Sequence, residues 1–150
     1  MEKKEFEEYV NSRYNTEVMW YDTKSIANQN AYKKLQWILI IFSSLTPVLI
    51  ALDFGFSNFD FLKWVAVITA VIVGIATVSQ RTFKYYENWI NYRTVCENLR
   101  KEKYLHSTGT GDYTSIVDKD SLFVERVENW ISKENSTWIN TFHKRTSENN

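Results

Sequence analysis

Two apolar runs without a charged residue divide this chain, and the sequence on either side of them is mostly polar. The runs cover residues 37–52 and 64–79. A helix needs roughly 20 predominantly apolar residues to cross a bilayer core about 30 Å thick. Apolar neighbours lengthen both runs, so the pattern predicts a helical hairpin through a membrane, with spans at 35–54 and 61–80. The alternative is that both runs are buried helices of a small soluble all-α domain, but charge-free stretches in such helices are usually shorter, at about 10–14 residues.

The flanking sequence predicts further helices. Apolar residues at helical spacing indicate a short helix over 3–14, and Thr16 is a plausible N-cap for a helix that continues into the first span. Pro47 removes one backbone donor within that span and can kink it, and hydroxyls at Ser43 or Thr46 are expected to replace part of the lost bonding. We expect the second span to continue without a stop to about His106.

A Gly-rich segment at 107–112 breaks this pattern, and Asp118 or Asp120 then caps a last helix over 118–144. The fold class is therefore all-α: a two-transmembrane helical hairpin continuing into long cytoplasmic helices that form a helical bundle or stalk. We treat residues 1–150 as a single domain, with helices at 1–34, an external connector at 55–60, and cytoplasmic helices at 81–106 and 118–144.

Basic residues gather on one side of the two spans. Lys24, Lys33 and Lys34 precede the first, and several bases starting with Arg81 and Lys84 follow the second. By the positive-inside rule both termini are cytoplasmic, which predicts a multi-pass membrane protein. The 18 basic and 18 acidic residues balance, so no strongly basic surface favours nucleic acid. The single cysteine excludes an internal disulfide and suits a reducing compartment.

No group of residues has the spacing of a catalytic, cofactor or metal site. The sequence Gly109-Thr110-Gly111 lacks the preceding strand and the following Lys-Ser/Thr of a phosphate loop. Cys96 falls on an apolar stripe, where a buried small hydrophobe is expected. The two histidines are far apart in sequence. We therefore expect no cofactor, no metal ion and no enzymatic activity.

The polar and small residues inside the spans carry more information. Ala66, Ala70 and Gly74 recur at four-residue intervals, a pattern that lets membrane helices approach closely. One interpretation assigns this row to packing between the two spans, with the hydroxyls bonded to the backbone. The other places hydroxyls in the polar lumen of an oligomer. The candidate pore or helix-contact residues are Ser43, Thr46, Pro47, Thr69, Ala70, Gly74 and Thr77.

Aromatic residues make up 16 % of the chain, and many lie outside the spans. Such side chains bury large areas, either in a core or at a subunit interface. We expect a homo-oligomer in contact with membrane lipid.

A set of aromatic and charged positions resembles a known family. The sequence has Trp20-Tyr21 ahead of the first span, Trp89-x-x-Tyr92-Arg93-x-x-x-Glu97 followed by Glu102 after the second, and Gly111-x-Tyr113. With Pro47-Val48-Leu49 inside the first span, this pattern is similar to the SLATT domain over roughly residues 9–142.

SLATT proteins are bacterial two-transmembrane effectors that occur beside nucleotide-generating or nucleotide-sensing components of conflict systems. The resemblance implies an antiphage effector that oligomerises and permeabilises the inner membrane when a nucleotide-type signal, or a sensor or nucleotide-synthesising partner, acts on its cytoplasmic helices. The alternative is a non-conducting scaffold that recruits a cytoplasmic partner. Whether the cytoplasmic motif (Trp20, Tyr21, Trp89, Tyr92, Arg93, Glu97 and Glu102) binds a ligand or packs helices together stays open.

Overall fold

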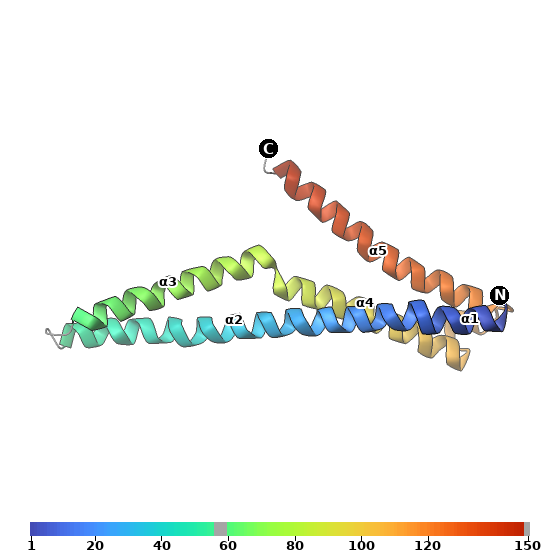
Figure 1. Ribbon diagram of the computed structural model, residues 1–150, viewed down its shortest axis with the longest axis horizontal. Helices are drawn as coiled ribbons and strands as arrows, with labels where there is room; N and C mark the ends of the chain where they lie inside the picture. Colours follow the sequence, from blue (N-terminus) through green and yellow to red (C-terminus); the bar gives the residue numbers. More distant parts are fainter. Residues whose placement is uncertain (56–59, 149–150) are drawn as a thin grey trace. The chain divides into compact units, whose positions relative to one another are not determined.

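The computed structural model describes the backbone of residues 1–55 and 60–148, and the side chains of residues 1–52 and 61–133. Every regular element in this part of the chain is helical, which confirms the predicted all-α class (Figure 1). The chain divides into two compact units. We call Ile26–Trp89 the apolar unit, and Met1–Ser25 together with Ile90–Asn150 the polar unit.

The N-terminal helix runs into the first apolar run without a break. Helix α1 (Lys3–Tyr9) passes into a π-helical turn, η1 (Val10–Tyr14), and then into α2 (Asn15–Gly55). The prediction that Thr16 caps a separate helix is wrong, because the preceding Asn15 is already helical (φ −64°, ψ −36°). The Thr16 hydroxyl donates to the Ser12 carbonyl at 2.6 Å instead, as hydroxyls do within helices.

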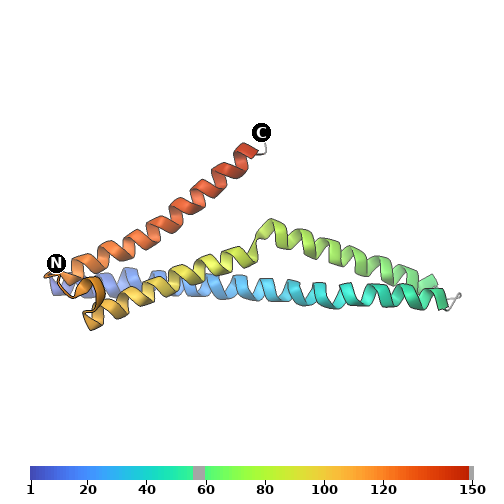
Figure 2. The same cartoon turned by 180° about the vertical axis from the view of Figure 1, so that it is seen from behind.

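The second apolar helix does stop, contrary to expectation. Helix α3 (Asp60–Phe83) and helix α4 (Tyr85–Thr108) are separated by Lys84, whose φ of 49° lies in the left-handed region (Figure 2). This conformation costs a residue with a Cβ about 1–2 kcal/mol. Asn88 Nδ2 donates to the Phe83 carbonyl at 3.1 Å, so this carbonyl keeps a hydrogen-bond donor despite the interruption of the helix.

A turn with two left-handed glycines leads into the last helix. Gly109 and Gly111 both have φ of 64°, and the short 3₁₀ helix η2 (Gly111–Tyr113) follows. Helix α5 (Lys119–Glu148) then begins directly after Asp118, whose carboxylate accepts the Ser121 backbone N–H at 3.0 Å. This confirms the predicted turn and the predicted cap, which satisfies one of the unpaired donors at a helix start.

The polar unit has its own hydrophobic core. Three residues of α5, namely Phe123, Val127 and Ile131, are buried on one face of the helix. The core also contains Tyr14, Tyr21, Val95, Cys96, Leu99 and Tyr113. Helices α2, α4 and α5 therefore share one set of buried contacts in this unit.

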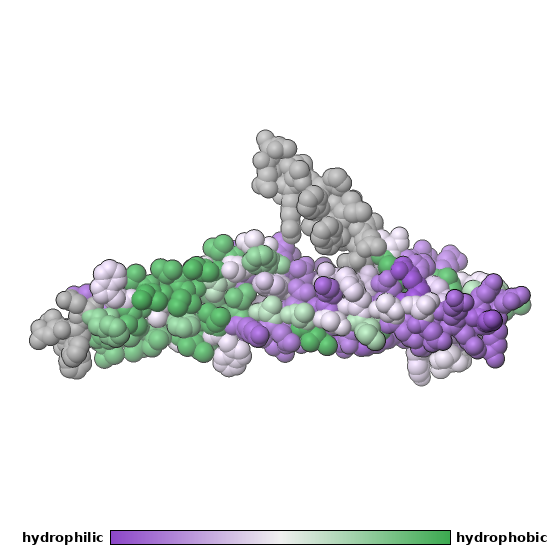
Figure 3. Space-filling view, in the orientation of Figure 1, coloured by the Kyte–Doolittle hydropathy of each residue, from purple (hydrophilic) through white to green (hydrophobic). Residues whose placement is uncertain are grey.

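The apolar unit contains little buried surface. Helices α2 and α3 run side by side (Figures 1 and 2), and Ala66, Thr69 and Ala76 of α3 are buried. The structure has two helices long and apolar enough to cross a membrane, and only 6 % and 11 % of their most apolar windows is buried. A helix in the core of a soluble domain is mostly buried, so these helices do not form such a core. Figure 3 shows the resulting apolar surface in green.

Candidate functional sites

The hydroxyls of Thr46 and Thr69 form a polar contact between α2 and α3. Their oxygen atoms lie 3.1 Å apart. Thr46 also lies 2.8 Å from the Phe42 carbonyl, and Thr69 lies 2.8 Å from the Ala66 carbonyl. Because each hydroxyl has a single proton, two protons serve three contacts. One hydroxyl must therefore divide its proton between its own helix and the neighbouring one, which makes the contact between the helices weak.

The small-residue row does not lie between the two helices as one interpretation predicted. Ala66 is buried, but Ala70 and Gly74 are exposed. A Cβ added at Gly74 would have no atom within 4 Å. The prediction is wrong for these two residues. The face of α3 that meets α2 contains Ala66, Thr69 and Ala76, and Ala70 and Gly74 lie outside this face. Their small surface is left available to another molecule.

The remaining candidates of the apolar runs make few contacts. Ser43 and Pro47 are exposed, and Thr77 donates to the Val73 carbonyl of its own helix at 2.8 Å. Pro47 lies inside α2, where the carbonyl that lacks its partner is that of Ser43. The Thr46 hydroxyl donates to Phe42 rather than to this carbonyl, so Thr46 does not replace the lost bond as expected.

The contact between Thr46 and Thr69 also sets the register of the hairpin. Two antiparallel helices rise equally per residue, so residues equally far from this contact lie at the same level. Lys34 and Arg81 are each twelve positions away, a rise of about 18 Å. By the same rule Lys63 lies level with Leu52. The charge-free slab between these two levels is about 27 Å thick at 1.5 Å per residue, close to the hydrocarbon core of a bilayer.

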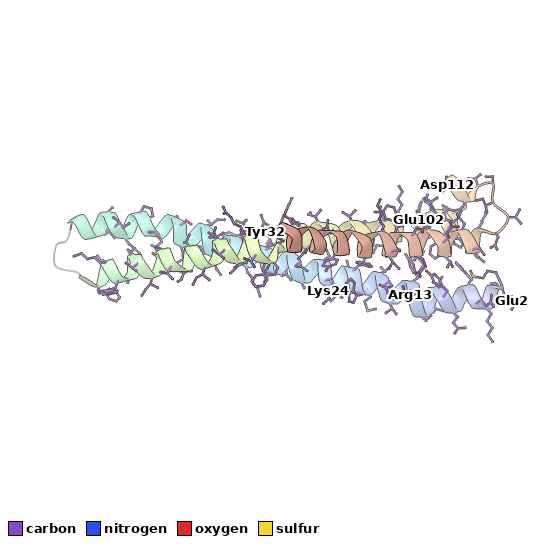
Figure 4. All side chains as sticks on the ribbon, turned by 90° about the horizontal axis from the view of Figure 1, so that it is seen from above. Glu2, Arg13, Lys24, Tyr32, Glu102 and Asp112 are labelled. Atoms are coloured by element: carbon purple, nitrogen blue, oxygen red, sulfur yellow. The ribbon has the colours of Figure 1, made fainter. Side chains whose placement is uncertain are left out.

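Aromatic side chains gather at one end of this slab. Tyr32 of α2, which Figure 4 labels, lies 5.2 Å from the ring of Tyr86 and 6.4 Å from that of Trp89. Gln36 Nε2 donates to the Tyr32 hydroxyl at 2.9 Å. Trp89 of the predicted cytoplasmic motif therefore packs against α2 within the apolar unit.

In the polar unit, another part of that motif is a ring cluster. Trp20 stands edge-on to Tyr21 and Tyr92, with ring centroids 4.9 Å and 5.6 Å away. Tyr21 is buried, whereas Trp20 is partly exposed. A surface cleft of about 330 Å³ opens beside Trp20, and it is lined by Arg13, Thr16, Glu17, Trp20, Tyr21 and Ile131.

Arg93 and Glu97 belong to an ionic network that joins α4 to α2. Their side chains, four residues apart on α4, pair at 2.6 Å. Asp22 of α2 accepts from Arg93 at 3.4 Å and from Arg100 at 3.3 Å. All these groups are partly exposed, so each pair stabilises the unit by less than about 1 kcal/mol. Cys96 beneath them is fully buried, and burial raises the pKa of its thiol, which makes it a poor nucleophile.

Glu102 lies in a buried polar contact of the polar unit. The residue is 4 % exposed, and its carboxylate accepts the Tyr113 hydroxyl at 2.9 Å and lies 3.1 Å from Arg126 Nε. Arg126 also pairs with Asp112, which Figure 4 labels beside Glu102. Burial and the bond to Glu102 raise the pKa of Tyr113, so its proton stays on the hydroxyl. Glu102 therefore packs α4, η2 and α5 together.

Several of these partners could not be found from the sequence. Arg100 could have been added, since it lies seven positions after Arg93 and thus on the same helix face. Asp22, Asp112 and Arg126 carried no such signal, because each meets its partner only through the tertiary fold. Among the described residues, no group of three or more His, Cys, Asp or Glu side chains could hold a metal ion.

The class of protein that these features define is an all-helical chain with two helices long and apolar enough to span a membrane. The family described as "Protein of unknown function (DUF4231)" matches residues 16–121, more than half of the chain, and the chain belongs to this family. The match covers the hydroxyl contact, the Asp22 network, and the bond between Glu102 and Tyr113. No curated protein and no solved structure matches the chain.

Proposed function

We propose that this protein is a two-span membrane effector that oligomerises and permeabilises the bacterial inner membrane, as its resemblance to SLATT proteins implies. The observation that carries the membrane placement is the charge-free slab about 27 Å thick. Only a small share of its two apolar helices is buried in the single chain. Such an apolar surface would drive aggregation in water, whereas the acyl chains of a bilayer are as apolar as the surface itself.

The distribution of charge orients the hairpin. Lys33, Lys34, Arg81 and Lys84 lie at one end of the slab, whereas Asp53 and Asp60 of the sequence lie at the other. The positive-inside rule then places both termini and the polar unit in the cytoplasm. There the shared core of α2, α4 and α5 would form the helical bundle or stalk that receives the trigger. The cleft beside Trp20 is the candidate place for a nucleotide-type signal or a sensor partner.

Association between copies is supported by the outward-facing pair Ala70 and Gly74. Exposed small residues one turn apart allow the backbone of a second helix to approach closely in a membrane. A Cβ added at Gly74 would meet no other atom within 4 Å, so the position is open to a second helix. A pore would have to form between copies, since Thr69 is buried in the hairpin contact and not in a lumen.

Replacing Gly74 by leucine tests this arrangement. The variant should insert normally, because glycine is about 0.8–1 kcal/mol less favourable in a helix than alanine and leucine ranks just below alanine, but it should not depolarise cells in a membrane-potential dye assay. The matched control is Val71→Leu on the same helix, where an exposed large side chain already stands and depolarisation should persist. Equal depolarisation by the wild type and Gly74→Leu would refute association through this face. Growth arrest without depolarisation by the wild type would refute permeabilisation.

A non-conducting scaffold is the second candidate, and one observation favours it. The hydroxyls of Ser44, Thr46, Thr69 and Thr77 all bond to carbonyls of their own helices, so few polar groups are left to line a channel. A scaffold predicts that liposomes containing the purified protein retain an entrapped dye, with or without nucleotides, while a cytoplasmic partner copurifies. Dye release would exclude it.

A further inference from the structure

The four bases at one end of the apolar unit form a belt, made by Lys33, Lys34, Arg81 and Lys84. Lys34 and Arg81 lie at the same level by the register of the hairpin, and Lys33 and Lys84 lie within one turn of them along the chain. Lys33, Lys34 and Arg81 are exposed. The acidic group paired with Lys84 is Glu87, 3.1 Å away and itself largely exposed. The belt therefore carries an excess of positive charge.

The direction of the side chains follows from helix geometry. At 3.6 residues per turn, Lys34 and Arg81 each lie about 120° around their helix from the threonine that faces the other helix. Their exposure agrees with this direction. Both bases thus point away from the α2–α3 contact, and their long apolar stems can lie along the hairpin while the charged ends extend outward.

Aromatic rings lie on both sides of this level. Tyr32 of α2 packs against Tyr86 and Trp89 of α4 on the side of the bases away from the slab, and the ring of Trp37 is 65 % exposed one turn deeper in the slab. Tyrosine and tryptophan concentrate at the boundary between hydrocarbon and headgroups. Cations one turn above the exposed ring of Trp37 reach the depth of lipid phosphates, where each contributes about 1 kcal/mol of attraction to an anionic surface.

We infer that this belt binds the headgroups of anionic phospholipids, and that it does so as a site shared by α2 and α3. The inference rests on the proposed placement of the hairpin in a bilayer. The partner is lipid rather than soluble phosphate, because the cations surround the rim of an apolar slab and do not converge on an enclosed pocket. The headgroups of the surrounding lipids then neutralise bases that would otherwise repel one another.

The test compares spin-labelled phosphatidylglycerol with spin-labelled phosphatidylcholine in vesicles that contain the purified full-length protein. Electron paramagnetic resonance gives the fraction of each lipid that is immobilised at the protein. We expect a preference of about fivefold for phosphatidylglycerol, which corresponds to about 1 kcal/mol for one cation at a membrane surface. Inorganic phosphate at constant ionic strength should leave this preference unchanged, and its loss under those conditions would overturn the choice of lipid as the partner.

The variant Lys33→Gln/Lys34→Gln/Arg81→Gln should reduce the preference to less than twofold. Its matched control, Lys3→Gln/Lys4→Gln/Lys101→Gln, removes the same charge from exposed positions of the polar unit and should keep the preference. Equal preference in both variants, or equal loss in both, would overturn the inference. Should the triple variant not reconstitute, Arg81→Gln alone should still halve the preference, and an unchanged value would count against the belt.

Alkaline carbonate extraction separates this inference from the proposal on which it rests. Wild-type protein that resists extraction but shows no lipid preference would refute only the headgroup site. Wild-type protein that is extracted would refute the membrane placement itself. Because both leaflets of the vesicles contain both labels, an inverted orientation of a variant does not affect the result.

Discussion

Removing the hydroxyl of Tyr113 measures how strongly the Glu102 contact holds the polar unit together. Tyr113→Phe keeps the buried ring, so it creates almost no cavity, but it removes the hydroxyl that donates to Glu102 at 2.9 Å. A hydrogen bond to a charged group contributes about 1.5–3 kcal/mol. Arg126 still contacts the carboxylate at 3.1 Å and limits the loss. We expect a decrease of about 2 kcal/mol in the free energy of unfolding.

For a chain of this length that loss lowers the melting temperature by about 4–8 °C, which near-ultraviolet circular dichroism in detergent micelles can follow. Tyr104→Phe is the matched control, because this tyrosine of α4 is 68 % exposed and its variant should stay within about 0.5 kcal/mol of the wild type. The free energy of unfolding of Glu102→Gln should lie between those of Tyr113→Phe and Tyr104→Phe, since the glutamine amide oxygen can still accept from the Tyr113 hydroxyl. If Tyr113→Phe were as stable as Tyr104→Phe, the buried carboxylate would not depend on the tyrosine, and the reasoning would be refuted.

Three further predictions concern other contacts. A double-mutant cycle of Thr46→Val and Thr69→Val should give a coupling of about 0.6 kcal/mol in unfolding of the micelle-bound protein, and a value above about 2 kcal/mol would contradict the shared proton. Lys84→Gly should stabilise the protein by about 1 kcal/mol, measured in the same way, and a destabilised variant would argue against a left-handed residue. The Ser121 hydroxyl and N–H, and then the amino terminus, lower the pKa of Asp118 to about 2, so its stabilising contribution is complete above about pH 4 and is lost as the pH falls towards 2. Asp118→Asn should remove this acid dependence from the unfolding curve, and an unchanged dependence would contradict it.

Local patterns predicted the helices well where the decisive forces were local. The absence of charge from residues 35–52 located the first apolar helix, the glycines of residues 107–112 located the turn, and side-chain chemistry identified the Asp118 cap. The break at Lys84 could not be predicted, because no residue there disfavours a helix and a lysine with positive φ has no sequence signature. Likewise, Glu102 looked like a charged surface position, and only the tertiary fold brings Tyr113 and Arg126 to it.

The faces of α3 show a similar limit. A four-residue repeat of small residues pointed to Ala66, Ala70 and Gly74, but the register with α2 selects Ala66, Thr69 and Ala76. Helix periodicity can state which residues share a face, but it cannot state which of two neighbouring faces meets the partner, since a shift of a single residue turns the helix by about 100°.

On the proposed membrane placement, the hydroxyls of the hairpin bear on how the protein would enter a bilayer. Because Thr46 and Thr69 each have a carbonyl acceptor in their own helix, either helix can leave the translocation machinery alone without exposing an unsatisfied donor to acyl chains. When the two helices meet, one threonine proton has only to turn from the carbonyl of its own helix towards the other hydroxyl. No polar group therefore has to lose water for the helices to pair. Insertion and pairing can thus occur one after the other during biogenesis, with the second helix free to arrive late.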